Sequence, residues 1–348
     1  MTIVNGEASI VDKNHVLCGD ETYECDNLLL CTGSETFIPP IPGIDTVPYW
    51  THRDALDNKE FPKSLVVIGG GVIGMEFASF FNSLGVEVTV IEMLDEILGG
   101  MDKELSAMLR AEYAKRGIKF MLNTKVVSLD GSAGENGETQ VRVNYENAEG
   151  TGFSVAEKLL MSVGRRPVTK GFGLENLNPE KTERGNIRVD GQMRTSVPGV
   201  YACGDLTGFS LLAHTAVREA EVAVHAVLGK KDCMSYRAIP GVVYTNPEIA
   251  GVGDTEEALQ KKGIPYRTVK LPMAYSGRFV AENEGVNGMC KLLLAEDDTV
   301  LGAHVLGNPA SEIITLAGMA VELKLTAAEW KKIVFPHPTV GEIFKEAL

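Results

Sequence analysis

The sequence lacks the features that would direct a chain into a membrane, onto nucleic acid or out of the cell. No segment approaches the roughly 18 consecutive apolar residues that a membrane span requires, and the N-terminus has no signal-peptide pattern. Lys and Arg number 33 against 47 Asp and Glu, a formal net charge of −14, so no general basic surface is available for phosphates. We therefore expect a cytoplasmic protein whose partners are neither nucleic acid nor membrane.

The cysteines lack the spacing of a metal site or a redox motif. No CxxC or CxxxxC pair occurs among the six of them. That pattern is also unlike the disulfide framework of a secreted domain. We interpret them as small buried or strand residues and predict no metal site. They are Cys18, Cys25, Cys31, Cys203, Cys233 and Cys290.

The first 61 residues lack a Gly-rich turn and a helix of their own. They offer short strands at Ala8–Val11 and Leu28–Cys31, followed by a Pro-rich crossing at residues 38–43. A compact βαβ domain does not begin in this way. We interpret the segment as the tail of a domain whose start lies elsewhere.

From Lys63 the sequence has the alternating pattern of a nucleotide-binding half-domain. A strand, a Gly-rich turn and a helix precede a second strand, a second helix and a third strand, which is the βαβαβ order. The predicted ranges are Leu65–Ile68, Gly69–Gly74, Met75–Leu84, Val86–Ile91, Asp102–Arg116 and Ile118–Leu122. A polar turn at Asp130–Gly137, a hairpin strand at Val141–Tyr145 and a closing strand at Leu159–Val163 complete the unit.

The second half begins with a predicted strand at Val200–Ala202, a Gly204–Asp205 turn and a helix at Leu212–Val227. From Ile239 on, strand-like runs mix with helical ones. This order is typical of an α+β domain.

The turn Gly69–Gly74 has the GxGxxG pattern, and its surroundings make the pattern specific. It follows a strand, opens a helix, and is followed roughly 20 residues later by Glu92 at the end of the next strand. Gly69 would permit the tight turn, Gly71 the approach of a pyrophosphate to backbone N–H groups, and Gly74 close helix packing. Glu92 would bind ribose hydroxyls and repel a 2′-phosphate, so we predict NAD rather than NADP. Alternatively, the glycines serve only a tight turn and Glu92 is a solvated strand end.

Two further groups are ambiguous on their own. Asp205 follows a strand, where a carboxylate can bind sugar hydroxyls, but it could equally cap a turn. His337 lies between two prolines with Glu342 five residues on, so the carboxylate could hold Nδ1 and make the ring a general base. His–Pro pairs also occur in ordinary turns, where they have no catalytic role.

Taken in order, these motifs resemble the pyridine nucleotide-disulfide oxidoreductases, and the dihydrolipoyl dehydrogenase group in particular. The similarity runs from about Asn5 to the end of the chain. It rests on the LCTGS segment at 30–34, with Cys in place of the family's Ala, the fingerprint at 69–76 with Glu92, the GRRP turn at 164–167, Gly204–Asp205 with residues 211–214, the segment 244–248 that opens the dimerisation domain, and His337-Pro338-Thr339 with Glu342.

The resemblance implies an α/β fold in which a Rossmann-like NAD domain is inserted in a remnant FAD domain and followed by an α+β dimerisation domain. The implied segments are a partial FAD-binding domain at 1–61, the NAD-binding domain at 62–180, a second FAD-binding segment at 181–232 and the dimerisation domain at 233–348.

The resemblance also implies the site residues. Those for NAD are Gly69, Gly70, Gly71, Val72, Ile73, Gly74, Glu76, Glu92, Val126 and Gly164. Those for FAD are Ala8, Thr32, Gly33, Ser34, Asp205, Leu211, Leu212, Ala213 and His214. The implied catalytic residues are His337 and Glu342.

The implied activity is oxidation of protein-bound dihydrolipoamide by NAD⁺ through FAD and a redox disulfide. His337 would deprotonate a dihydrolipoyl thiol, the thiolate would attack the disulfide, and electrons would pass to FAD and then, as hydride, to NAD⁺. In the family this histidine serves the partner subunit's site, which implies a homodimer. The implied partner is the lipoyl-bearing protein of a 2-oxo acid dehydrogenase or glycine cleavage complex.

The family's first GxGxxG and its CxxxxC pair do not occur in this sequence. We therefore expect the 348 residues to bind FAD weakly and not to oxidise dihydrolipoamide by themselves. Glutathione reductase-like enzymes use NADP and would not be expected to carry Glu92, mercuric reductases have a C-terminal cysteine pair, and soluble transhydrogenases lack the histidine. Two alternatives stay open: another flavin-dependent disulfide reductase, and a non-catalytic NAD-binding and dimerisation module.

Overall fold

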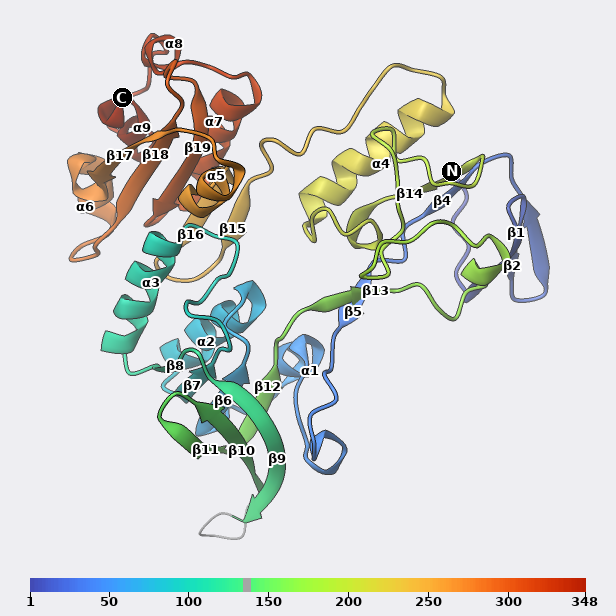
Figure 1. Ribbon diagram of the computed structural model, residues 1–348, viewed down its shortest axis with the longest axis horizontal. Coiled ribbons are helices and arrows are strands. Elements are labelled where there is room, and N and C mark those ends of the chain that lie inside the picture. Colours follow the sequence, from blue (N-terminus) through green and yellow to red (C-terminus); the bar gives the residue numbers. More distant parts are fainter. Residues whose placement is uncertain (134–138) are drawn as a thin grey trace. The chain divides into compact units, whose positions relative to one another are not determined.

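The computed structural model describes residues 1–133 and 139–348, with side chains outside 132–139, and the chain folds into two compact units (Figure 1). Unit 1 comprises Met1–Thr36 and Arg165–Tyr236, and unit 2 comprises Phe37–Gly164 and Arg237–Leu348. The chain thus leaves unit 1 at Thr36 and re-enters it at Arg165. This arrangement confirms the predicted fold class. The segment boundaries 1–61, 62–180, 181–232 and 233–348 stay a prediction.

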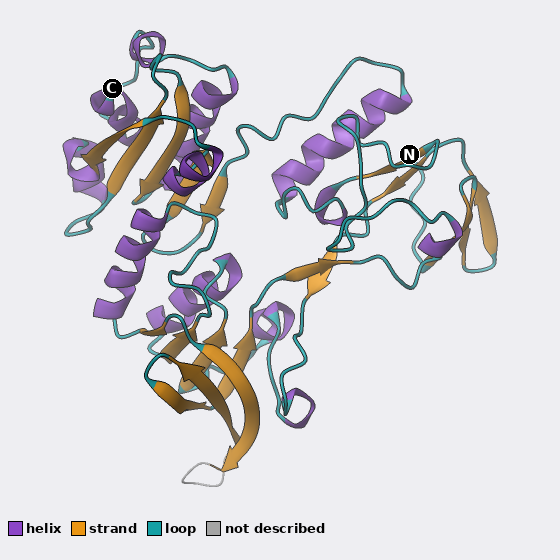
Figure 2. Cartoon of the chain, in the orientation of Figure 1, coloured by secondary structure: helices purple, strands orange, loops and turns teal. Residues whose placement is uncertain are grey.

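Unit 1 is built from short strands in small sheets (Figure 2). Strands β1 (Ala8–Asp12), β2 (His15–Cys18) and β3 (Glu21–Glu24) form an antiparallel sheet, β4 (Leu28–Leu30) pairs in parallel with β14 (Val200–Ala202), and β5 (Ser34–Thr36) pairs with β13 (Arg165–Pro167). The 3-10 turns η2 (Leu174–Asn176) and η3 (Gly204–Leu206) and helix α4 (Ala213–Val227) complete the unit. Its core gathers Ile10, Leu30, Leu174, Ile187, Val200, Ala202 and Leu206.

The inserted part of unit 2 contains the predicted βαβαβ half-domain. Strands β12 (Lys158–Met161), β6 (Ser64–Ile68), β7 (Glu87–Ile91) and β8 (Lys119–Met121) form a parallel sheet in that order, with α2 (Val72–Ser83) and α3 (Lys103–Lys115) as the connections between β6, β7 and β8. Met75, Ala78 and Phe81 are fully buried at helical spacing on α2. Helix α2 begins at Val72 rather than at the predicted Met75, because Gly71 is its N-cap.

The 3-10 turn η1 (Ile44–Thr46) and helix α1 (His52–Asp57) precede the parallel sheet in the sequence. A second sheet, which is antiparallel, comes between β8 and β12 in the sequence. Its order is β11 (Gly150–Ala156), β10 (Thr139–Asn147) and β9 (Lys125–Ala133). The predicted polar turn at Asp130–Gly137 is wrong over 130–133, because β9 continues there and pairs with β10. The remainder of that predicted turn lies outside the described residues.

The C-terminal part of unit 2 is α+β, as predicted. Its antiparallel sheet has the order β15 (Gly241–Val243), β16 (Ile249–Gly253), β19 (Val300–Leu306), β18 (Met289–Leu294) and β17 (Arg267–Pro272). The helices are α5 (Glu256–Lys262), α6 (Gly277–Glu282), α7 (Ala310–Glu322), α8 (Ala327–Lys331) and α9 (Ile343–Ala347), with η4 (Met273–Tyr275) and η5 (Val340–Glu342). The apolar face of α7 packs on this sheet through Ile314, Ala317 and Val321.

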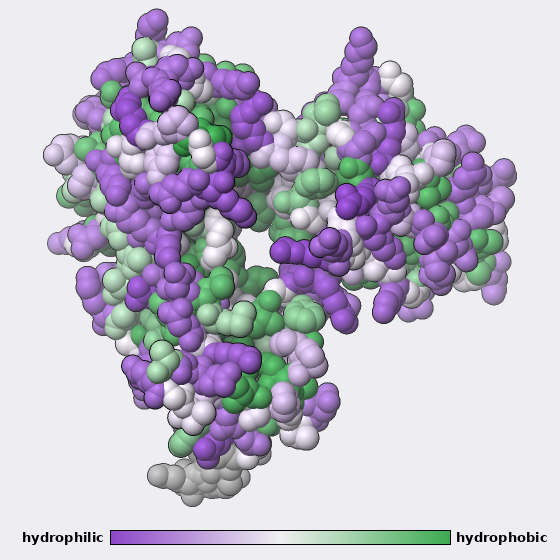
Figure 3. All heavy atoms as spheres, in the orientation of Figure 1, coloured by the Kyte–Doolittle hydropathy of each residue, from purple (hydrophilic) through white to green (hydrophobic). Residues whose placement is uncertain are grey.

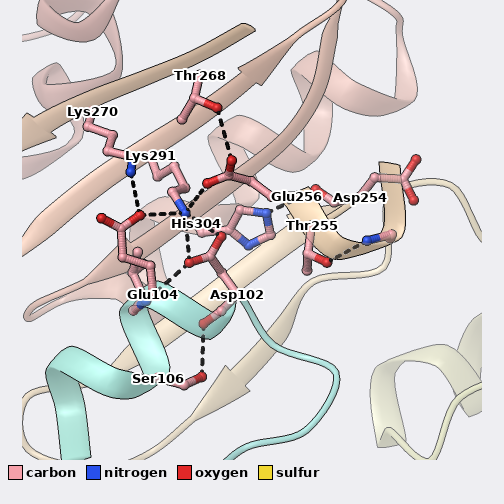
Figure 4. Close-up of polar contacts among 12 residues, drawn as sticks. Asp102, Glu104, Ser106, Asp254, Thr255, Glu256, Thr268, Lys270, Lys291 and His304 are labelled. Carbon is pink, nitrogen blue, oxygen red and sulfur yellow. Dashed lines mark hydrogen bonds and ion pairs between the residues drawn. The ribbon is translucent and has the colours of Figure 1, made fainter. Parts of the chain in front are cut away.

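A buried ion cluster joins α3 to this C-terminal sheet within unit 2 (Figure 4). The Lys291 ammonium on β18 is 1% exposed and lies 2.8 Å from Asp102, 2.8 Å from Glu104 and 2.5 Å from Glu256. Asp102 also caps α3, since its carboxylate accepts a hydrogen bond from the Leu105 N–H at 3.1 Å. One cation therefore holds carboxylates from two helices against the sheet.

Hydrophilic side chains dominate the face shown in Figure 3, with smaller hydrophobic patches between them. This distribution agrees with the acid-rich composition. Among the helices of the described part of the chain, none is both long and apolar enough to cross a membrane.

Candidate functional site

The Gly-rich loop joins β6 to α2, and Gly69 and Gly74 in it lie too close to neighbouring backbone atoms to carry a side chain. Gly69 has φ +102°, and a Cβ there would lie 2.3 Å from the Ser162 carbonyl oxygen. A Cβ on Gly74 would lie 2.1 Å from the Gly69 oxygen, so α2 packs directly on the loop. A Cβ on Gly71 would instead meet nothing within 4 Å. The loop is thus open at Gly71, beside the first N–H groups of α2, and this fits a pyrophosphate.

The Glu92 carboxylate lies against the same loop. One oxygen accepts a hydrogen bond from the Gly70 N–H at 2.6 Å and the other from the Leu94 N–H at 2.8 Å. The structure therefore brings Glu92 together with Gly69–Gly74, including Val72 and Ile73 in the first turn of α2. A negative charge fixed beside the loop favours ribose hydroxyls over a 2′-phosphate.

The remaining residues assigned to NAD have other contacts. The Glu76 carboxylate on α2 accepts a hydrogen bond from the Tyr244 N–H at 2.8 Å, and desolvation raises the pKa of this carboxyl. Val126 lies on β9 and packs against the core beside the parallel sheet. Gly164 has φ +121°, and its carbonyl oxygen accepts a hydrogen bond from the Phe37 N–H at 3.0 Å.

In unit 1 the two segments assigned to FAD meet through side chains. The Ser34 hydroxyl donates a hydrogen bond to the Asp205 carboxylate. The Arg165 guanidinium donates to the Ser34 hydroxyl and to the Ser34 carbonyl, both at 2.6 Å, and lies 3.7 Å from the Asp205 carboxylate. The Thr32 hydroxyl donates to the Val168 carbonyl at 2.7 Å, and Gly33 has φ +69°. A carboxylate held in this way fits the role of a ligand for ribityl or ribose hydroxyls.

Sequence reasoning gave Arg165 no role in this site. The signal that could have found it is the GRRP turn itself, in which Arg165 opens β13 opposite β5. In that register Arg165 pairs with Thr36 and Pro167 pairs with Ser34. The arginine thus positions the carboxylate rather than serving only as a turn residue.

The start of α4 lies close to η3. Leu212 is the N-cap, Ala213 and His214 are the first helical residues, and Leu211 is 48% exposed. A Cβ on Gly204 would lie 3.2 Å from the Ala216 Cβ, so the helix approaches the Gly204–Asp205 turn closely. Ala8 lies on β1, which belongs to a different sheet from β4 and β14.

His337 lies between α8 and η5, and it forms a hydrogen-bonded pair with Glu342, the last residue of η5. His337 Nδ1 lies 2.9 Å from the nearer carboxylate oxygen of Glu342, whose other oxygen accepts a hydrogen bond from the Thr339 N–H at 2.7 Å. The Thr339 N–H and the His337 contact lower the pKa of Glu342, so this group is ionised at neutral pH. An ionised carboxylate only accepts, so Nδ1 carries the hydrogen and Nε2 is the acceptor of a neutral ring. The imidazole is 82% exposed.

Two family models match the chain. "Pyridine nucleotide-disulphide oxidoreductase" matches residues 1–220, and "Pyridine nucleotide-disulphide oxidoreductase, dimerisation domain" matches residues 239–348. The mitochondrial dihydrolipoyl dehydrogenase of Homo sapiens is 38% identical over 357 residues, which cover 99% of this chain and 68% of that protein. The dihydrolipoyl dehydrogenase of Geobacillus stearothermophilus is 38% identical over 351 residues, which cover 99% of this chain and 73% of that protein.

Two solved structures have a similar fold. The HOCl-induced flavoprotein disulfide reductase RclA from Escherichia coli matches with a TM-score of 0.88 at 27% identity, covering 99% of this chain and 78% of that one. LpdA from Mycobacterium tuberculosis matches with a TM-score of 0.85 at 28% identity, covering 98% and 75%. The resemblance inferred from the sequence motifs is confirmed. The chain belongs to the pyridine nucleotide-disulphide oxidoreductase family.

Proposed function

We propose that this chain contributes to a dihydrolipoyl dehydrogenase, which oxidises protein-bound dihydrolipoamide with NAD⁺. The observation that carries the proposal is the pair of His337 and Glu342, with Nδ1 2.9 Å from the carboxylate and the ring exposed. Such a pair is suited to take a proton from a thiol presented by a large partner, because the base is accessible and its tautomer is fixed.

The chemistry at His337 follows from its hydrogen bond. A neutral ring with hydrogen on Nδ1 accepts the thiol proton at Nε2, and the Glu342 carboxylate then faces an imidazolium ring. The Glu342 carboxylate also accepts a hydrogen bond from the Thr339 N–H, so it stays ionised and does not take up the proton itself. The product is a thiolate, which is the nucleophilic form of sulfur.

Residues of unit 2 would hold NAD. Gly71 and the start of α2 would take the pyrophosphate, and Glu92 would take the ribose hydroxyls. In unit 1, Ser34 and Asp205 would hold FAD, with Arg165 fixing their geometry. The chemistry that these cofactors would supply when bound is acceptance of an electron pair from the thiol and its transfer as hydride.

We further propose a cytoplasmic homodimer that serves a lipoyl-bearing protein of a 2-oxo acid dehydrogenase or glycine cleavage complex. The match of residues 239–348 to the family's dimerisation domain supports the homodimer. The dihydrolipoyl dehydrogenases among its relatives support the lipoyl partner.

A second candidate is a reductase of disulfides or oxidants other than lipoamide. The likeness to RclA, with a TM-score of 0.88, favours it. An assay of the chain complemented with the family's first FAD-binding segment and its CxxxxC pair, and supplied with FAD, separates the two. We expect NAD⁺-dependent oxidation of dihydrolipoamide. Reduction of other disulfides by NADPH without dihydrolipoamide oxidation would assign the second function instead.

The Glu92→Ala change should weaken NAD⁺ binding by about 1–3 kcal/mol, or roughly 5- to 150-fold in Kd, because ribose hydroxyls would lose their acceptor. Isothermal titration of the purified chain measures the effect. Glu87→Ala is the matched control, since Glu87 is an exposed carboxylate at the other end of β7. Equal losses of NAD⁺ affinity in the two variants would show that Glu92 does not bind the nucleotide.

A further inference from the structure

Two cysteines that the proposed function does not use lie side by side in unit 1. The Sγ atoms of Cys31 and Cys203 are 3.3 Å apart, although 172 positions separate the residues in the sequence. Both are free thiols in the structure. Neither spacing nor motif in the sequence indicates the pair, because the fold creates it.

The backbone places these thiols in register. Strands β4 and β14 pair in parallel with Leu30 opposite Ala202, and the next residues are Cys31 and Cys203. The Cys203 N–H continues the ladder by donating to the Leu30 carbonyl at 3.1 Å. Neighbouring strands lie about 4.8 Å apart, and disulfides span Cα separations of about 4.4–6.8 Å. Small side-chain rotations that bring the sulfurs roughly 1 Å closer would therefore permit a bond.

The two thiols differ in access and in acidity. Cys31 is exposed, whereas Cys203 is 4% exposed. The hydrogen bond with Cys203 lowers the pKa of Cys31 to about 7. The same contact, together with burial, raises the pKa of Cys203. The buried Glu219 carboxylate, which accepts a hydrogen bond from the Gly204 N–H at 2.6 Å, adds to this rise. Cys31 is therefore the thiolate that attacks a disulfide, and Cys203 is the protonated thiol that reacts after it.

We propose that Cys31 and Cys203 are a redox-active dithiol that low-molecular-weight disulfides oxidise to an intramolecular disulfide. The Cys31 thiolate attacks one sulfur of the small disulfide, and the first small thiolate leaves. The Cys203 thiol then gives its proton to the first small thiolate and attacks the Cys31 sulfur of the mixed disulfide, which releases the second small thiolate. Two protein thiols are oxidised and one small disulfide is reduced to two thiols. This chemistry requires neither NAD nor FAD, so it is independent of the proposed function.

The test treats the reduced 348-residue chain with oxidised glutathione at pH 7 and follows intact mass and peptide cross-links. We expect a cross-link between the Cys31 and Cys203 peptides, no glutathione retained on either of these two cysteines, and reversal by dithiothreitol. Cys203→Ser should instead accumulate a glutathione adduct on Cys31, and Cys31→Ser should leave Cys203 unmodified. Cys233→Ser is the matched control, because Cys233 is also exposed in unit 1. It should behave as the unchanged protein does.

A second measurement needs no variant and guards against misfolding at the buried Cys203. At pH 7, iodoacetamide should alkylate Cys31 on the order of tenfold faster than Cys233, an exposed cysteine of the same unit that serves as the internal reference. A stable glutathione adduct on Cys31 of the unchanged chain would overturn the proposal. So would alkylation of Cys31 no faster than that of Cys233.

Discussion

Replacing Lys291 by Met should lower the free energy of unfolding by about 3–5 kcal/mol, because it leaves the buried Asp102 carboxylate without its cation. Asp102 is as buried as Lys291 itself, at 1% exposure of each side chain, so water cannot take the place of the ammonium group. The Asp102 carboxylate would keep its N-cap hydrogen bond from the Leu105 N–H, so the lost stability would affect the start of α3 in particular. Urea unfolding followed by circular dichroism measures the change.

The Lys270→Met variant is the matched control for this experiment. Lys270 binds Glu104 at 2.6 Å, but its side chain is 42% exposed. An exposed ion pair contributes about 0–1 kcal/mol, so this variant should unfold close to the unchanged chain. Equal effects of the two substitutions would contradict the role assigned to the buried ammonium group.

Acid should reduce the difference between the Lys291→Met variant and the unchanged chain. Burial acts to raise the pKa of Glu104 and of Glu256, but their contacts with lysine lower it below the ordinary value. A lowered folded-state pKa contributes stability that is present above the ordinary pKa and lost as pH falls through the folded-state value. Unfolding at pH 7 and at about pH 4 should therefore show a smaller difference at the lower pH. A constant difference would contradict the ionic origin.

The same direction of pH dependence is expected from His304. Desolvation lowers the pKa of this buried histidine on β19 below its ordinary value. The unfolded chain therefore binds a proton before the folded chain does as pH falls, and stability decreases below the ordinary histidine pKa. The charge of Lys291 adds to the lowering of this pKa, so the Lys291→Met variant should lose less stability through His304 than the unchanged chain. This effect also makes the difference between the two smaller at low pH.

Replacing His337 by Gln should lower kcat/KM for dihydrolipoamide by roughly 10²- to 10⁴-fold in the chain complemented with the family's CxxxxC segment, the range for loss of a general base. Gln can still hydrogen bond to Glu342 but cannot take a proton at neutral pH. NAD⁺ affinity should be unchanged, since the nucleotide residues lie at β6, α2 and β7. Steady-state assays of dihydrolipoamide oxidation would show the loss.

His15→Gln is the control for that experiment. His15 also has Nδ1 2.9 Å from a carboxylate oxygen, that of Asp12, but it lies on β2 in unit 1. Its replacement should leave activity within about twofold of the unchanged protein. Similar losses in both variants, or full activity of His337→Gln, would contradict the assignment of the base.

The sequence was sufficient to predict features that depend on short separations along the chain. The strand, turn and helix around Gly69–Gly74 come from local periodicity and from glycines that permit a tight turn. Glu92 could be placed beside that turn because the following parallel strand ends at the same edge of the sheet. The five-residue spacing of His337 and Glu342 likewise allowed their contact to be anticipated.

Features that depend on long-range pairing could not be predicted. Cys31 and Cys203 are neighbours only because β4 and β14 pair across an inserted domain. Lys291 meets Asp102 across 189 positions, and a lysine in an apolar strand gives no sign of its partner. The order β15-β16-β19-β18-β17 is also fixed by side-chain packing rather than by local propensity.

The most direct test of the central claim is isothermal titration of the purified chain with NAD⁺ and with NADP⁺. The loop at Gly69–Gly74, with the Glu92 carboxylate 2.6 Å from the Gly70 nitrogen, predicts that NAD⁺ binds more tightly than NADP⁺. Glu92→Ala should narrow that preference. Tighter binding of NADP⁺, or binding of neither nucleotide, would contradict the account.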